Sequence, residues 1–271
     1  MSGFFRVGGA AYDDFMGRYS MRLAPLFADF AGVQGGRVLD VGAGTGALTG
    51  ELLRRGADVA AAEPSPEFFA ALRERFPSIE VVQAPAERLP FADGSFDAAL
   101  AQLVVAFMED APAAVAEMGR VGGAVAVCMW GVMEMEMFGA INRTAEAIGV
   151  SREAEAGARR YRTPEELGEL LAPLGRVESA ALDVTADYDD FEEFWSALSR
   201  QVGPAGAWLA ALSEEQRGQA RDEMHRQVGS PSGPFSLSGR CYAARVSTDA
   251  RSAPVPTSVT STSSSRSTNS T

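Results

Sequence analysis

Cysteine and histidine are scarce in this chain. Its 271 residues include only two cysteines, Cys128 and Cys241, and one histidine, His225. Both cysteines fall inside apolar runs, a pattern that is typical of reduced core thiols and excludes a disulfide framework. Reduced thiols indicate a cytoplasmic protein. The same scarcity leaves no Cys/His cluster with the spacing of metal ligands, so we expect no metal site.

Long apolar runs and an excess of positive charge are also missing. No segment approaches the roughly 18 apolar residues of a membrane span, and the N-terminus lacks the pattern of a signal peptide. The net charge is −12, with 24 basic and 36 acidic residues. Such a chain repels phosphate backbones, so we expect a small-molecule partner, no nucleic acid and no membrane span. No pattern in the sequence sets an oligomeric state.

Short β-like runs alternate with helical patterns through most of the chain, and 46% of the residues are apolar. This alternation is typical of βαβ units in a parallel sheet, and the length suits one α/β domain. Two later runs lack the crossover rhythm and favour an antiparallel edge. The predicted strands cover Arg37–Val41, Asp58–Glu63, Ile79–Gln83, Phe96–Gln102, Ala124–Trp130, Val177–Ala186 and Phe235–Val246.

The two ends of the chain differ from the main domain, which we place at residues 31–246. Residues 247–271 are mostly Ser and Thr, which predicts a disordered tail. In residues 1–30, apolar side chains recur at three- and four-residue steps from Tyr12 to Phe30. That spacing predicts a helix with one apolar face and a kink near Pro25.

A glycine loop is the most informative feature of the sequence. The stretch RVLDVGAGTG at residues 37–46 predicts a buried strand that enters a glycine turn and then a helix. Gly42 and Gly44 permit a tight turn and a close approach of backbone to ligand, and Gly46 permits close packing. The spacing Gly42-x-Gly44-x-x-Ala47 also fits a relaxed dinucleotide pattern, so an NAD site stays an alternative.

Asp40 stands directly before this loop. A carboxylate there is unfavourable beside a pyrophosphate but favourable beside a ligand that carries an ammonium and a sulfonium. A cationic nucleoside is therefore the favoured ligand. The alternative is that Asp40 only accepts hydrogen bonds from the amides of its own loop.

Further nucleoside contacts are expected after the second and third strands. Glu63 ends the second strand about 20 residues beyond the loop, where an acid receives ribose hydroxyls in this fold. Pro64 and Ser65 stop that strand and cap the next helix. Ala86 and Glu87 could supply a backbone amide and an acceptor for an adenine ring. The alternatives are a solvated Glu63 and a polar surface loop at Ala86.

Four stretches resemble the successive motifs of class I S-adenosylmethionine-dependent methyltransferases, similar to the ubiquinone/menaquinone-biosynthesis and actinobacterial small-molecule enzymes. They are VLDVGAGTG, the Glu that ends the next strand, AERLPFADGSFDAALAQLVVAFM and GGAVAVCMW. The opening YDDFMGRYS resembles the lid helix of that subgroup. The resemblance implies an α/β Rossmann-like three-layer sandwich, with a mostly parallel seven-stranded sheet and an antiparallel edge strand.

The resemblance also implies S-adenosylmethionine as the cofactor, a lid region at residues 1–30 and acceptor-side helices at residues 131–235. The residues that it places around the cofactor are Arg18 and Tyr19 in the lid, Asp40, Gly42, Ala43, Gly44, Thr45 and Gly46 in the loop, Glu63, Pro64 and Ser65 at the ribose, Ala86 and Glu87 at the adenine, and Gln102 and Leu103 near the sulfonium.

Three positions depart from the pattern of these relatives. Pro85 replaces a small polar or acidic residue, and Gly131 follows Trp130 where Asp is common. The segment Glu117–Gly123 is several residues shorter than the usual approach to the fifth strand. The short segment puts the fourth helix of the domain in doubt.

Methyl transfer needs alignment of two groups more than it needs a side-chain acid or base. We therefore assign no catalytic residue and interpret His225, in a polar helical segment, as a solvated side chain. Trp195 and the methionines from Met133 to Met137 are either acceptor contacts or core. Two other functions stay open, an NAD-dependent oxidoreductase and a non-catalytic cofactor-binding scaffold.

Overall fold

The strands of the computed structural model form one seven-stranded sheet in the order β3-β2-β1-β4-β5-β7-β6. The structure describes residues 13–151, 160–200 and 203–247. Five strands, β1 to β5, pair in parallel, and β7 is antiparallel to both β5 and β6. Their bounds are β1 Arg37–Val41, β2 Asp58–Ala62, β3 Glu80–Val82, β4 Phe96–Gln102, β5 Gly122–Trp130, β6 Val177–Tyr188 and β7 Phe235–Ser247.

The predicted fold class is confirmed, since the sheet is mostly parallel and alternates with helices. The antiparallel strand β7 lies one position inside the edge, because β6 pairs along its outer side from Val177↔Val246 to Tyr188↔Phe235. The carboxyl ends of β1 and β4 lie side by side at the point where the strand order reverses. In open α/β sheets, ligands bind at this switch point.

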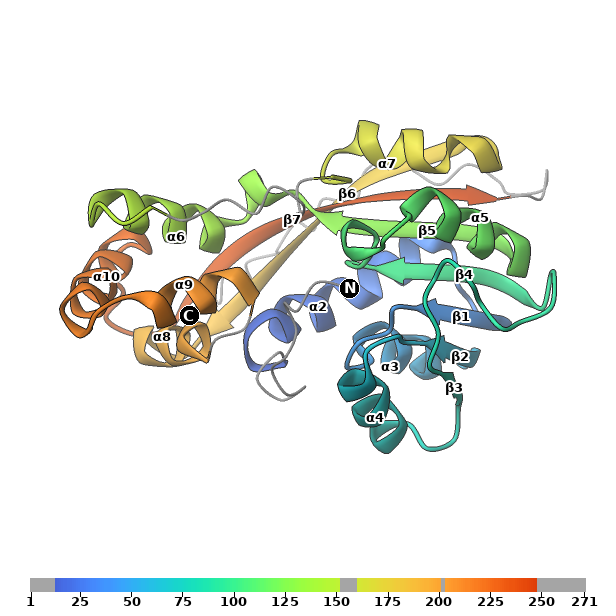
Figure 1. Ribbon diagram of the computed structural model, residues 1–271, viewed down its shortest axis with the longest axis horizontal. Coiled ribbons are helices and arrows are strands. Elements are labelled where there is room, and N and C mark those ends of the chain that lie inside the picture. The colour runs from blue at the N-terminus through green and yellow to red at the C-terminus, as the bar shows by residue number, and fades with distance from the viewer. Residues whose placement is uncertain (1–12, 152–159, 201–202, 248–271) are drawn as a thin grey trace, which may run out of the picture.

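Helices cover both faces of the sheet (Figure 1). α2 and α3 pack on one face, and α5 and α7 pack on the other. The α-helices are α2 Arg18–Ala31, α3 Ala47–Arg54, α4 Pro66–Arg75, α5 Ala111–Val121, α6 Glu136–Ala147, α7 Pro164–Leu171, α8 Phe191–Ser199, α9 Gly203–Ala211 and α10 Glu214–Gln227. Shorter helical turns are η2 Asp13–Gly17, η3 Val105–Phe107, η4 Val132–Glu134 and η5 Ala172–Leu174.

The short segment before β5 does not remove the fourth helix of the domain. α5 begins at an Asp110 cap, whose side chain accepts from the amide of Ala113, and it buries Val115 and Met118. It then enters β5 directly at Gly122. The connection from β4 to β5 therefore contains a complete crossover helix.

Four helices form a lobe at one end of the molecule, where β6 and β7 extend beyond the parallel strands (Figure 1). α6, α8, α9 and α10 make this helical lobe, and its core includes Phe194, Leu198 and Met224. Within residues 13–151, 160–200 and 203–247, no helix combines the length and the apolar character needed to cross a membrane.

The N-terminal helix is part of the core. Tyr19, Leu23 and Phe27 of α2 are fully buried, and α2 contacts α3 and β6. α2 continues through Pro25 to Ala31. α2 is therefore packed as a core helix, and the lid role of residues 1–30 stays a prediction. Tyr12 and the rest of residues 1–12, like the predicted tail from residue 248, lie outside the described residues.

Candidate cofactor site at the carboxyl ends of the parallel strands

The glycine loop connects β1 to α3 in the geometry that the sequence predicts. Gly42, Gly44 and Gly46 all have φ in the left-handed region, at 69°, 57° and 87°. A Cβ on Gly46 would lie 2.4 Å from a ring carbon of Phe76, whereas a Cβ on Gly44 would meet nothing within 4 Å. Gly46 therefore serves packing, and Gly44 leaves open space beside the loop backbone.

Hydrogen bonds join this loop to the end of β2. The amide of Gly42 donates to the carbonyl of Ala62 at 2.7 Å, and Ala43 donates to the same oxygen at 3.3 Å. The loop is therefore held against β2, where Glu63 follows.

Glu63 binds the loop with its carboxylate. Its side chain is 5% exposed, and its two oxygens accept from the amide of Gly44 at 2.8 Å and from the amide of Ser65 at 2.9 Å. Burial raises the pKa of Glu63 above its usual value. This geometry excludes the alternative of a solvated surface residue. Ser65 caps α4 as predicted, and the carbonyl of Pro64 accepts from Gln83.

Asp40 is completely enclosed beneath the loop. Its Oδ2 accepts from the hydroxyl of Thr49 in α3 at 2.6 Å, and its side chain is buried. Burial raises the pKa of Asp40 to about 7. The carboxylate therefore holds the first turn of α3 and provides a buried acid at the switch point.

This burial predicts a pH-dependent stability. The raised folded-state pKa means that the contribution of Asp40 is fully present below pH about 4, its ordinary pKa, and is lost as the pH rises through about 7. Between pH 5 and 8, the free energy of unfolding should fall by on the order of 2–3 kcal/mol more in the native protein than in Asp40→Asn. Asn keeps an oxygen for the Thr49 hydroxyl. Urea unfolding without ligand measures this difference, and parallel pH profiles for the two proteins would contradict it.

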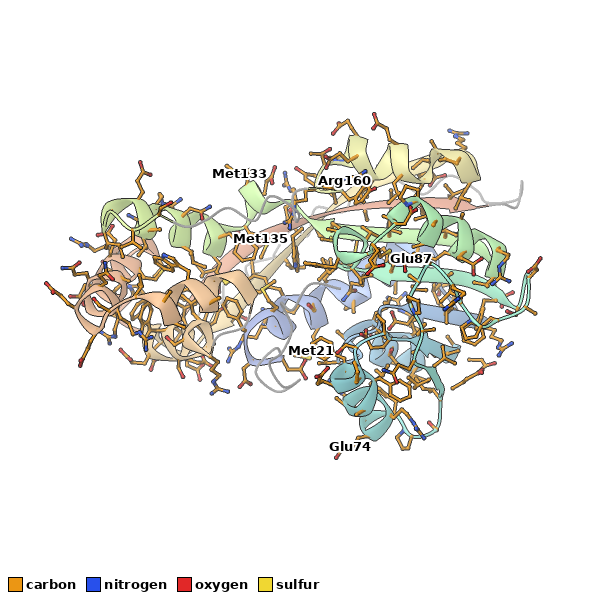
Figure 2. The ribbon with its side chains drawn as sticks, viewed as in Figure 1. Met21, Glu74, Glu87, Met133, Met135 and Arg160 are labelled. Carbon is orange, nitrogen blue, oxygen red and sulfur yellow. The ribbon has the colours of Figure 1, made fainter. Side chains whose placement is uncertain are left out.

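The predicted adenine residues lie on one loop. Ala86 is buried, and Oε1 of Glu87 accepts from the amides of Glu109 and Asp110 at 2.9 and 3.1 Å. Glu87 thus lies beside the start of α5 (Figure 2). One of its oxygens orders that turn, and a contact from Glu87 to an adenine stays a prediction.

Gln102 ends β4, and Leu103 follows the strand. The side-chain amide of Gln102 donates to the carbonyl of Ser20 at 3.1 Å, and its Oε1 is buried. Leu103 has φ of 64° although it is not glycine, and its amide donates to the carbonyl of Cys128 at 2.9 Å. A non-glycine residue in this region stores backbone strain, a feature that is common at ligand sites.

Arg18 contacts β6 and α8, and a contact from Arg18 to a cofactor stays a prediction. It donates to the carbonyl of Asp187 at 2.9 Å and pairs with Glu193, while its guanidinium stacks over Tyr188. Arg18 therefore connects α2 to β6 and α8, because its guanidinium pairs with the carboxylate of Glu193 and stacks on the ring of Tyr188. Tyr19 is buried and packs edge-on against Trp130 at 6.0 Å.

Asp13, close to Arg18 in the N-terminal segment, contacts the glycine loop. The hydroxyl of Thr45 donates to Asp13 Oδ1 at 2.6 Å. Arg75 pairs with Asp13 at 3.3 Å and donates to the carbonyl of Thr45 at 3.0 Å. The sequence interpretation missed Asp13, although its position in YDDFMGRYS could have indicated it.

The Asp13 contact predicts a selective effect on cofactor binding. Asp13→Ala removes the acceptor of the Thr45 hydroxyl, so S-adenosylmethionine affinity should fall by roughly 2- to 10-fold. Asp14→Ala is the matched control, since Asp14 pairs with Arg200, the residue that follows α8. Isothermal calorimetry on both variants tests this, and equal losses in the two would show a general effect of the N-terminal segment.

His225 lies in the helical lobe, where its ring packs edge-on against Phe191 at 4.7 Å and its Nε2 is 3.1 Å from the carbonyl of Pro231. The described contacts tie His225 to its own lobe. These contacts give no support for a general base. His225 has a packing role in addition to the solvated position that the sequence predicts.

Part of the chain is similar to a known protein family. Residues 39–127 match the family described as methyltransferase domain. An uncharacterized methyltransferase of Mycobacterium tuberculosis is 38% identical over 115 residues, which are 42% of this chain and 46% of that protein. The demethylmenaquinone methyltransferase of Beutenbergia cavernae is 41% identical over 87 residues, 32% of this chain and 36% of that protein. The chain thus spans less than half the length of these relatives.

Solved structures show the same fold across more of the chain. A candidate type II methyltransferase from Anaeromyxobacter dehalogenans has a TM-score of 0.59 at 20% identity, with 83% of this chain and 94% of that chain covered. A phosphoethanolamine N-methyltransferase from Haemonchus contortus, solved with S-adenosylhomocysteine, has a TM-score of 0.53 at 15% identity and covers 89% of this chain and 57% of that chain.

Residues 39–127 therefore resemble a methyltransferase domain, in agreement with the motifs found in the sequence. The match includes the end of β1, the glycine loop, Glu63 and most of β5. The same comparisons support S-adenosylmethionine as the cofactor of this domain. The roles of individual residues stay predictions.

Proposed function

We propose that this chain transfers a methyl group from S-adenosylmethionine to a small-molecule acceptor. The observation that carries the proposal is the link between Glu63 and the amide of Gly44, beside a loop that leaves open space at Gly44. This arrangement fits a nucleoside with hydroxyls at Glu63 and an amino-acid part along the loop. When bound, the cofactor supplies an electrophilic methyl group that an acceptor displaces in line from the sulfonium.

The protein's own contribution is binding and orientation. Glu63 would accept hydrogen bonds from the ribose hydroxyls, and the Gly44 backbone would approach the cofactor closely. Asp40 would add a negative charge close to the positive groups, since opposite charges nearby favour its ionised form. Alignment at the end of β4 then supplies most of the rate effect, and no side-chain base is required.

A small acceptor fits the charge of the chain and the named relatives. The net charge of −12 disfavours nucleic acid. Among the relatives, one is a demethylmenaquinone methyltransferase and another, from Halorhodospira halophila, is a malonyl-acyl-carrier-protein O-methyltransferase. We also propose a cytoplasmic location, which the two free, buried cysteines support.

Another activity on this fold needs a direct test. The 4+2 cyclase SpnF has a TM-score of 0.51 to this chain at 22% identity. Cofactor binding by itself would therefore not establish methyl transfer. Asp40 argues against an NAD-dependent oxidoreductase, because a buried acid next to the loop is unfavourable beside a pyrophosphate.

Two measurements test the proposal. Calorimetry should show tighter binding of S-adenosylmethionine than of NAD. Incubation with a quinol and polyketide panel should release S-adenosylhomocysteine, detected by mass spectrometry together with a methylated product. Tighter NAD binding would overturn the cofactor assignment. Binding of S-adenosylmethionine without turnover on any acceptor would favour a non-methylating role.

A further inference from the structure

The two residues predicted at the adenine, Ala86 and Glu87, lie in the loop that joins β3 to β4. Residues 83–95 form this β3–β4 loop and include no helix or strand. Within the loop, the amide of Arg88 donates to the carbonyl of Pro85 at 3.2 Å. A loop without regular structure keeps one conformation only when other elements bind its backbone, because its own ordering costs entropy.

The helix α5 binds the backbone of the β3–β4 loop through its two charged side chains, Glu117 and Arg120. Oε2 of Glu117 accepts from the amide of Leu89 at 3.1 Å. The guanidinium of Arg120 donates to the carbonyl of Leu89 at 3.0 Å and to the carbonyl of Phe91 at 2.8 Å. Both backbone polar groups of Leu89 are therefore held by α5. We call Glu117 and Arg120 the α5 clamp.

The hydrogen bonds of Arg120 use all five N–H donors of a guanidinium. Besides the carbonyls of Leu89 and Phe91, it donates to the two carboxylate oxygens of Glu117, both at 2.8 Å, and to Asp93 at 2.7 Å. A bidentate pair of this kind fixes the orientation of the guanidinium. Arg120 therefore has no donor left for a ligand, and it acts only through the loop.

The first turn of α5 holds the same loop two residues before Leu89. Oε1 of Glu87 accepts from the amides of Glu109 and Asp110, where α5 begins. The side chain of Leu89 is 3% exposed and lies in the same core cluster as Val115 of α5. The loop is thus attached to α5 on both sides of Arg88, next to the residues predicted at the adenine.

The short connection after α5 makes this support rigid. α5 enters β5 directly at Gly122, where a Cβ would lie 2.9 Å from the amide nitrogen of Ala99 in β4. The carbonyl of Arg120 accepts from the amide of Gly94 at 2.9 Å. The segment Glu117–Gly123, which is shorter than in the resembling family, therefore fixes the last turn of α5 against β4 and the end of the loop.

We propose that Glu117 and Arg120 are positioning residues for recognition of the cofactor's base. The α5 clamp holds the β3–β4 loop in the conformation in which the Ala86 amide and the Glu87 carboxylate meet the adenine. A loop that is ordered before binding spends no binding free energy on its own ordering. This inference rests on the proposed function, because the base belongs to the cofactor that the chain is proposed to bind.

Two ligands that differ only in the base test this inference. In S-inosylhomocysteine, the exocyclic amine of S-adenosylhomocysteine becomes a carbonyl oxygen and the adjacent ring nitrogen gains a proton, so donor and acceptor exchange places. By calorimetry, the native protein should bind S-adenosylhomocysteine at least roughly tenfold more tightly, as expected for hydrogen bonds that include a charged group. Arg120→Gln should reduce this preference to about threefold or less, since the loop loses its fixed conformation.

Two further variants separate positioning from stability. Arg120→Lys keeps the positive charge but has three donors in place of five, so its preference should lie between those of the native protein and Arg120→Gln. Arg245→Gln is the matched control, because Arg245 pairs with Glu178 at 2.7 Å and donates to the carbonyl of Phe30 at 2.7 Å. Its melting temperature should fall, as in Arg120→Gln, but its preference for the adenine ligand should stay native.

The inference is wrong if folded Arg120→Gln keeps the native preference, or if Arg245→Gln loses the preference to the same extent. Where Arg120→Gln does not fold, Arg120→Lys decides, and a native preference in that variant contradicts the inference. Native protein that binds both ligands equally would overturn this inference alone. Native protein that binds neither ligand would overturn the proposed function, and the inference with it.

Discussion

Replacing Glu63 with alanine is expected to weaken S-adenosylmethionine binding by roughly 10- to 150-fold, the effect of losing hydrogen bonds to a charged group worth about 1.5–3 kcal/mol. Two losses act together. The variant lacks the carboxylate expected to receive the ribose hydroxyls, and the amides of Gly44 and Ser65 lose their acceptor. Both effects raise the dissociation constant.

Calorimetry on a folded Glu63→Ala variant measures this effect. Glu80→Ala is the matched control, because Glu80 lies on the neighbouring strand β3 and is 54% exposed in a pair with Arg37. The control should bind the cofactor like the native protein. Native affinity in a folded Glu63→Ala variant would remove the main support for the site.

Replacing Gly46 with alanine is expected to destabilise the fold by about 2–5 kcal/mol, from overpacking of about 1–3 kcal/mol and a left-handed backbone that costs about 1–2 kcal/mol. The added Cβ would lie 2.4 Å from Phe76 and 2.7 Å from Leu72, and φ of Gly46 is 87°. Leu72 belongs to α4 and Phe76 follows that helix, so the start of α3 must shift relative to these two side chains.

Gly44→Ala separates stability from binding. Its Cβ has open space, so only the backbone cost of about 1–2 kcal/mol applies. If that space belongs to the cofactor, Gly44→Ala should lose more affinity than its modest loss of stability explains. Urea unfolding gives the free energy for each variant, and calorimetry gives affinity. Equal stability losses at the two glycines would contradict the assigned roles.

The N-terminal segment connects two parts of the molecule. On one side Asp13 binds Thr45 of the glycine loop, and on the other Arg18 pairs with Glu193 of α8. A segment with these contacts can relate the cofactor loop to the helical lobe. The buried side chains of α2 show that this connection is built on a core helix.

Much of the fold and the site followed from the sequence. The bounds of β1 and β4 agree with the predicted Arg37–Val41 and Phe96–Gln102. Such short apolar runs between turn residues carry their own signal, because a buried strand needs apolar side chains on both faces. The glycine loop was equally visible, since a left-handed backbone favours glycine wherever it occurs.

What the sequence did not determine depends on contacts between distant residues. Whether Arg18 binds a ligand or pairs with Glu193 is decided by where β6 brings α8, 175 residues along the chain. The contact of Asp13 with Thr45 of the loop arises in the same way. Local patterns specify strands, turns and helix caps because those interactions span a few residues. The partner of a buried charge or hydroxyl is selected only when the sheet order brings the elements together.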